Sequence, residues 1–215
     1  MKLKRGFSSL LTLTCFAIPA GLDAEEIRGW YEAGATVMPS AKLTSFQTEI
    51  TSGEKVEFDP GFRFGVGIGT ELTRYVALEV ESGFHYNALH SISGAFNTDA
   101  QLYQIPVLGN VVFQFPNRTR FVPVIGAGAG AISAILDADN ISFGASTLSG
   151  SEQTWTFAYQ GYAGLQYHFA ENMGVGLFYH YMVSDRPSWG DGPDGVVKFN
   201  RLQSHSLALT LNFRF

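Results

Sequence analysis

Four ionisable residues, each in a segment of small or apolar neighbours, could carry chemistry in this sequence: Arg63, Glu79, Glu81 and His180. Polar and apolar residues alternate around them, as in "FRFGVG" and "ALEVES". A carboxylate that is removed from water needs a cation or hydrogen bonds, and otherwise it takes up a proton. The pattern therefore predicts a buried polar network that fills an interior, with Arg63, Glu81 and Glu79 together in its upper half and Glu32, His168 and Arg214 lower down. A gated path for protons or small ions is the alternative.

Serine and histidine near the end of the chain raise a second possibility, which is nucleophilic catalysis. His205 lies between Ser204 and Ser206. If this segment is a strand, adjacent side chains point to opposite faces, and neither serine can then act as the partner of His205. His85 and His90 flank a predicted loop and have no further metal ligand nearby. We expect no enzymatic activity and no catalytic, cofactor-binding or metal-binding residues.

The stretch "FVPVIGAGAGAISAIL" could also be read as a nucleotide-binding motif. Gly126, Gly128 and Ala131 fit a relaxed dinucleotide fingerprint, but the acidic residue expected about 20 positions later is absent. Glycine at every second position of a strand instead predicts room for bulky side chains on the inner face. We expect no cofactor.

The elements that hold these residues are predicted to be strands. The uncharged runs 100–117 and 153–170 are long enough for membrane-spanning helices. In "YQGYAGLQYHF", however, Gln160, Gln166 and His168 would be spread around a helix, whereas a strand places all three on one face. Strict alternation of this kind recurs eight times, near residues 30–38, 61–70, 75–86, 102–115, 120–132, 159–169, 173–182 and 205–215.

Eight such segments predict an all-β fold, an eight-stranded antiparallel up-and-down transmembrane β-barrel. Short turns are expected at "TELTR", "PNRT" and "AEN", and long loops at 39–60, 87–101, 133–153 and 183–201. Aromatic residues gather near both ends of the predicted outer faces, as two interfacial girdles would require. The last strand, which ends at Phe215, is expected to pair with the first and close the ring.

Composition agrees with a membrane location. Charged residues make up only 15% of the 215 residues, against about 25% in soluble domains. The formal net charge of −5 argues against nucleic acid as a partner. Residues 1–24 have a basic start, a short apolar stretch and small residues, which predicts a cleaved Sec-type signal peptide followed by one domain, 25–215. Cys15, the only cysteine, lies inside this segment.

The segments "GWYEAGATVM", "FRFGVGIG", "YQIPVLGNVVFQF" and "LALTLNFRF" resemble the eight-stranded outer-membrane β-barrel family, that is, opacity-type porins and outer-membrane-protein-A-like barrel domains. The resemblance covers most of residues 29–215. It implies a location in the outer membrane of a Gram-negative bacterium, surrounded by membrane lipid and lipopolysaccharide. It also implies that Leu211, Phe213 and Phe215 form the C-terminal signal read by the barrel-insertion machinery.

We expect the protein to act at the cell surface. We predict a structural or surface-interaction protein that presents four extracellular loops and can bind a surface ligand. We expect it to be a monomer. The alternative is a narrow porin-like channel for small or hydrophobic solutes. The third possibility is an enzyme that modifies lipid A.

Overall fold

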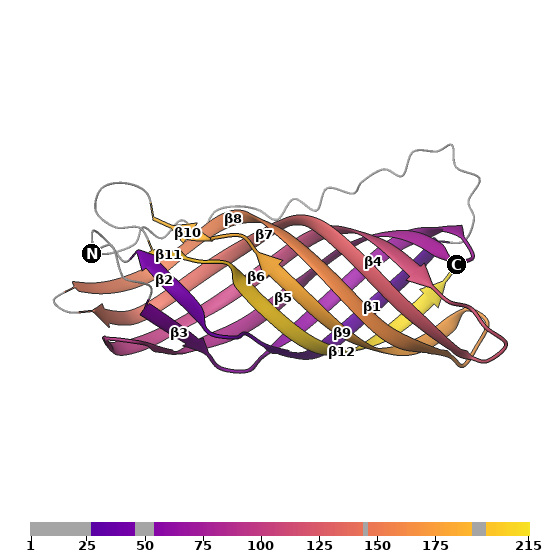
Figure 1. The fold of residues 1–215 in the computed structure, drawn as a ribbon, viewed down its shortest axis with the longest axis horizontal. Coiled ribbons are helices and arrows are strands. Elements are labelled where there is room, and N and C mark those ends of the chain that lie inside the picture. The colour runs from indigo at the N-terminus through magenta and orange to yellow at the C-terminus, as the bar shows by residue number, and fades with distance from the viewer. Residues whose placement is uncertain (1–26, 46–53, 144–145, 191–196) are drawn as a thin grey trace.

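The computed structural model describes residues 27–45, 54–143, 146–190 and 197–215. Eight antiparallel strands form a closed ring (Figure 1). In order around the ring they are β1 (Ile27–Val37), β4 (Gly61–Thr73), β5 (Val76–Ile92), β6 (Ala95–Gln114), β7 (Phe121–Phe143), β8 (Ser146–His168), β9 (Met173–Ser184) and β12 (Leu202–Arg214). The predicted fold class is therefore confirmed.

The first and last strands close the barrel, as the sequence predicted. Tyr31 pairs with Leu211 and Val37 pairs with His205 along the β1–β12 ladder. The Phe215 amide donates a hydrogen bond of 2.9 Å to the carbonyl of Ile27. No edge of the sheet is left open at this seam, so the end of the chain is held within the ladder.

The predicted signal peptide, residues 1–24, lies outside the described residues and stays a prediction. No helix in the described part of the chain is long and apolar enough to cross a membrane.

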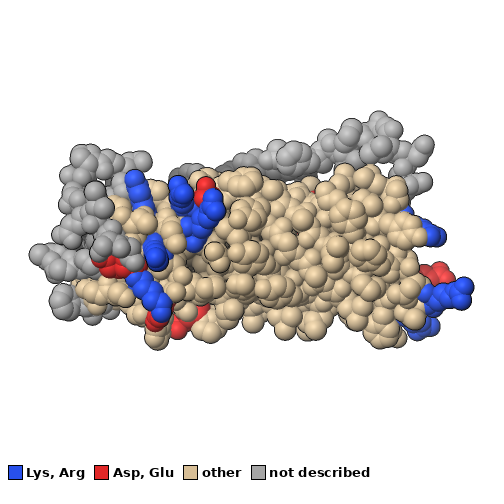
Figure 2. Space-filling view, viewed as in Figure 1, with Lys and Arg blue, Asp and Glu red and all other residues tan. Residues whose placement is uncertain are grey.

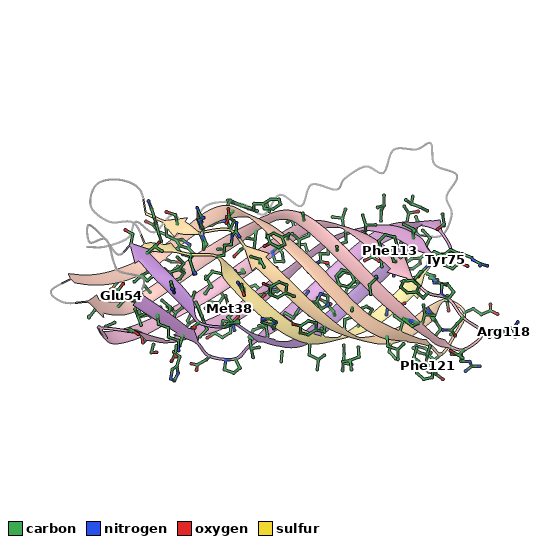
Figure 3. All side chains as sticks on the ribbon, viewed as in Figure 1. Met38, Glu54, Tyr75, Phe113, Arg118 and Phe121 are labelled. Atoms are coloured by element: carbon green, nitrogen blue, oxygen red, sulfur yellow. The ribbon has the colours of Figure 1, made fainter. Side chains whose placement is uncertain are left out.

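The outer surface of the barrel is an apolar belt between two charged ends, and on the face shown in Figure 2 the belt carries no charged side chain. The short turns lie at one end, where Figure 3 places Tyr75, Phe113, Arg118 and Phe121. Short turns mark the periplasmic end of such barrels. Aromatic rings contact one another at both rims, for example Phe121 with Tyr167 and Tyr86 with Tyr103, with centroids 4.9 and 5.4 Å apart. The two predicted girdles are present.

Two predicted loops are wrong. Residues 87–101 and most of 133–153 continue the strands, because β5 and β6 meet in a tight turn after Ile92 and β7 runs on to Phe143. Beyond the membrane the alternation inverts: Leu102 and Leu136 point inward and are buried, whereas Asp139 is exposed on the outside. The prediction followed apolar residues on the outer face and therefore stopped at the membrane surface.

The other two predicted loops contain short strands that extend the sheet. These are β2 (Ala41–Ser45), β3 (Glu54–Phe58), β10 (Ser188–Trp189) and β11 (Val197–Phe199), which join the upper part of β5 in the order β10-β11-β2-β3-β5. The Trp189 indole donates a hydrogen bond of 2.9 Å to the carbonyl of Ala134 on β7. We call this extracellular part the strand extension.

The strand extension has an apolar core of its own. Its buried aliphatic members include Leu43, Leu102, Leu136 and Ile141, each no more than 2% exposed. Trp189 and Phe199 pack edge to face across it, with ring centroids 5.4 Å apart. The barrel therefore has two interiors in series, a polar one within the membrane and an apolar one outside it.

A buried charged network in the barrel interior

The four ionisable residues singled out from the sequence all lie inside the barrel. Arg63 on β4, Glu79 and Glu81 on β5, and His180 on β9 point inward and are at most 4% exposed. Each follows the alternation of its strand, because every second residue faces the interior. The structure places all four in one interior but divides them between two clusters.

The first cluster is centred on Glu32 of β1. The Arg63 guanidinium donates to Glu32 Oε1, and His180 Nε2 lies 3.2 Å from Glu32 Oε2. Arg63 is farther from Glu81, with 3.9 Å between Nη2 and Oε1. Glu81 is instead held by Asn110, whose Nδ2 donates a hydrogen bond of 2.7 Å. Glu32, which the sequence placed lower in the barrel, is the main carboxylate partner of Arg63.

The second cluster holds Glu79, which the sequence grouped wrongly with Arg63. Arg28 Nε lies 2.8 Å from Glu79 Oε1, and the Trp30 indole donates a hydrogen bond of 2.9 Å to Glu79 Oε2. Arg28 Nη1 also donates to Gln114 Oε1 at 3.1 Å. Sequence reasoning missed Arg28, although Arg28, Trp30 and Glu32 share the inner face of β1 by alternation.

The charged network reaches the periplasmic rim through Glu71. Its Oε1 lies 3.7 Å from Arg28 Nη1 and 3.1 Å from Arg214 Nη2. His168, which was expected to join Arg214, lines a small cavity near the same rim. Alternating cations and anions therefore run from the periplasmic end to the middle of the barrel.

Glycines give these large side chains their space, as the sequence predicted. A Cβ atom on Gly67 would lie 2.4 Å from the Trp30 ring, and one on Gly126 would lie 2.2 Å from the Tyr162 ring. Both distances are far below a normal contact. The glycines of "GVGIG" and "GAGAG" therefore face the interior. β7 is a strand along its whole length, so "GAGAG" is not the turn of a nucleotide-binding unit.

The interior is almost completely filled. The cavity beside Arg28, Trp30 and Tyr162 has a volume of about 20 Å³, which is room for about one water molecule. Above the two clusters, Leu108, Ile132, Ala158 and Met182 form an apolar layer with at most 2% exposure. The polar interior is thus bounded by apolar packing on its extracellular side.

The serine and histidine near the end of the chain do not form a catalytic pair. Ser204 and Ser206 point inward and are 3% exposed, whereas the His205 ring lies outside, with Nδ1 2.6 Å from the Tyr179 hydroxyl. The prediction that they face opposite sides is confirmed. Among the described residues, no three His, Cys, Asp or Glu side chains lie close enough together to hold a metal ion.

Leu211, Phe213 and Phe215, the proposed insertion signal, lie on the outer side of the closing strand. Leu211 is 37% exposed and Phe215 is 80% exposed. The Phe213 ring meets Tyr31 edge to face, with centroids 6.0 Å apart. Recognition of these residues by the insertion machinery stays a prediction.

Solved structures with the same fold are outer-membrane barrels. Neisserial surface protein A matches with a TM-score of 0.53 and 17% identity, covering 87% of this chain and 97% of its own. OprG from Pseudomonas aeruginosa matches with a TM-score of 0.57 and 14% identity, covering 88% and 97%. The protease OmpT from Escherichia coli matches with a TM-score of 0.54 at only 9% identity, covering 90% and 98%. At these identities the likeness shows the fold alone.

No curated protein matches the chain. A family model described as the outer membrane protein beta-barrel domain matches residues 8–215. This range contains all eight strands of the ring and both charged clusters. The chain is a bacterial outer-membrane protein and belongs to the outer membrane protein beta-barrel domain family.

Proposed function

We propose that this protein is a non-conducting, non-enzymatic barrel that anchors a rigid interaction platform at the cell surface. The observation that carries the proposal is the apolar core of the strand extension, which lies directly in line with the barrel interior. An ion or a small polar solute that entered from outside would have to leave water and cross this core. That step is costly for any charged or polar group.

The polar clusters below the core support a structural role. Arg63 and His180 both lie against the Glu32 carboxylate, and Arg28 and Glu79 form a second compact pair. Separating the members of a buried ion pair leaves a charge away from water without a partner, which is costly. They fill the barrel in the way that side chains fill other eight-stranded barrels.

The strand extension is the proposed platform. The sequence predicted four surface loops, but β2, β3, β10 and β11 give two of these connections a defined structure, and long continuations of β5 to β8 replace the others. A preformed surface loses less conformational freedom when it binds a partner than a flexible loop does. The extension is therefore suited to hold interacting side chains in fixed positions.

Planar-bilayer recording on the refolded protein tests the proposal. We expect no stepwise current at any voltage, because the apolar core blocks the path. Reproducible conductance steps would contradict the proposal and favour the channel for small solutes. Mass spectrometry of lipid A from cells with and without expression of the protein should give identical spectra, and a modified lipid A would favour the enzyme.

A further inference from the structure

The ion pairs of the barrel interior contain one more carboxylate than guanidinium group. Among the described residues, these pairs join the cations Arg28, Arg63 and Arg214 to the anions Glu32, Glu71, Glu79 and Glu81. Near the periplasmic rim the charges balance, because two guanidinium groups meet two carboxylates there. The surplus negative charge therefore lies in the first cluster, where Arg63 alone meets both Glu32 and Glu81.

Glu81 is the carboxylate of this cluster that lacks a close cation. The Arg63 guanidinium donates to Glu32, whereas 3.9 Å separates Arg63 Nη2 from Glu81 Oε1. That separation is too long for a hydrogen bond. Glu81 is also buried, so water does not replace the missing partner. A carboxyl group in such surroundings is more stable with a proton than with a charge.

His180 is the other group of the cluster that could take up the proton, but its surroundings favour the neutral ring. An imidazolium has two N–H groups that both need acceptors. Nε2 faces Glu32, whereas Nδ1 is buried without a hydrogen-bond partner among the described residues. Arg63 already lies against the same carboxylate, and a second cation beside it would be repelled. The surplus charge is therefore not cancelled by His180.

A protonated Glu81 has an acceptor within reach, because two side-chain amides form a chain from it. Asn110 Nδ2 donates a hydrogen bond of 2.7 Å to Glu81 Oε2, and Gln160 Nε2 donates one of 3.0 Å to Asn110 Oδ1. An amide that turns over exchanges its oxygen and its nitrogen. With both amides turned, the Glu81 hydroxyl donates to the Asn110 oxygen and Asn110 donates to the Gln160 oxygen. The same three side chains can thus hold the ionised or the protonated acid.

The other titratable and charged groups that face Glu81 in the described interior do not supply the missing positive charge. They are Arg63 on β4, Glu32 and Arg28 on β1, Glu79 and His85 on β5, Tyr162 on β8 and His180 on β9. Arg28 is already paired with Glu79. His85 is buried beside Arg63, and neither ring nitrogen has a hydrogen-bond partner within the described chain, so its ring is neutral. The described inward residues of β6, β7 and β12 around this site are uncharged, such as Asn110, Gly128 and Ala208.

We propose that Glu81 holds a proton in the folded barrel at neutral pH, so that the closed interior carries no net charge. A glutamate in the unfolded chain is ionised at this pH. Folding therefore takes one proton from water and forms one O–H bond on Glu81, and no other bond changes. Because the folded state then binds more protons than the unfolded state, its stability falls as the pH rises, until the folded barrel also releases the proton. The inference goes beyond the proposed surface role, since it concerns the interior alone.

Infrared spectroscopy of the folded protein, in a detergent without ester groups, tests the inference. At neutral pH the wild type should show the carbonyl band of a protonated carboxylic acid, which is separate from the bands of ionised carboxylates. Glu81→Gln should lose this band. Glu57→Gln is the matched control, because it makes the same change at an exposed carboxylate, and it should keep the band. A wild type without the band, or a band that persists in Glu81→Gln, would overturn the inference.

Urea unfolding in lipid vesicles at a series of pH values provides a second measurement. Above the range in which an ordinary glutamate titrates, the unfolding equilibrium constant of the wild type should rise with pH more steeply than that of Glu81→Gln, by about tenfold per pH unit for one proton. At neutral pH the two proteins should be about equally stable, because glutamine replaces a neutral acid of the same shape. Parallel pH profiles, or a Glu81→Gln variant that fails to fold, would count against the proton on Glu81.

Discussion

At the scale of single residues, alternation on each strand predicted which side chains point inward, but not which of them meet. Arg63 and Glu79 were correctly placed inside, yet Glu79 pairs with Arg28 and Arg63 with Glu32. The stagger between strands decides these partners. Sequence periodicity gives the face of a residue and leaves its height relative to other strands undetermined.

The Glu32 carboxylate should be the most sensitive single group in the barrel, because Arg63 and His180 both depend on it. Glu32→Gln leaves the Arg63 charge buried with weaker partners and should lower the free energy of unfolding by about 3–5 kcal/mol. Urea unfolding in lipid vesicles measures this change. Glu57→Gln, which breaks the exposed pair with Lys55, is the control and should leave the unfolding midpoint unchanged. Equal midpoints for both variants and the wild type would refute the role of Glu32.

Gly67 should tolerate no side chain, because its added Cβ would overlap the Trp30 ring. Gly67→Ala should destabilise the barrel by about 1–3 kcal/mol through overpacking. Gly109→Ala is a matched control, since nothing lies within 4 Å of an added Cβ there. The same urea experiment compares the two variants, and a loss of stability at Gly109 as large as that at Gly67 would contradict the packing described for the interior.

At the scale of elements, the sequence predicted the eight membrane-spanning strands but not their continuation outside the membrane. Within the lipid, apolar side chains face outward; beyond it, Leu102 and Leu136 face inward, because water has replaced lipid on the outer side. A reading that follows only outward apolar residues ends where this inversion begins. The short strands β2, β10 and β11 are also hard to predict, because their pairing depends on partners far away in the chain.

We expect the order of the apolar core of the strand extension to depend only on residues that point inward. Leu102→Asp buries a charge in this core and should open the extension to proteolysis, while the membrane-spanning part remains folded. Ser151→Asp places the same charge on β8 where the side chain is half-buried at the surface, and should leave the extension resistant. Limited digestion of intact vesicles, followed by mass spectrometry of the fragments, measures the difference. Equal resistance of the two variants would argue against an ordered core.

At the scale of the whole molecule, the same strands extend from lipid into water. The interior is polar and the outer surface apolar in the lipid, and this arrangement is reversed in the water. The charged interior is enclosed by lipid-facing residues, and the apolar interior by strands that face water. The central claim is that the second interior is a closed, dry core that seals the first. The part of β7 beyond the membrane tests this claim best, because its side chains alternate between the core and the outer surface.

Thiol labelling of single-cysteine variants along β7 tests the claim most directly. In a chain whose Cys15 is changed to Ser, Leu136→Cys and Ala138→Cys would place the thiol in the core, and Asp137→Cys and Asp139→Cys would place it on the outer side. With a membrane-impermeant maleimide added to folded protein, the account predicts rapid labelling at 137 and 139, and labelling at 136 and 138 only after unfolding in urea. Similar labelling rates at all four positions in the folded protein would contradict it.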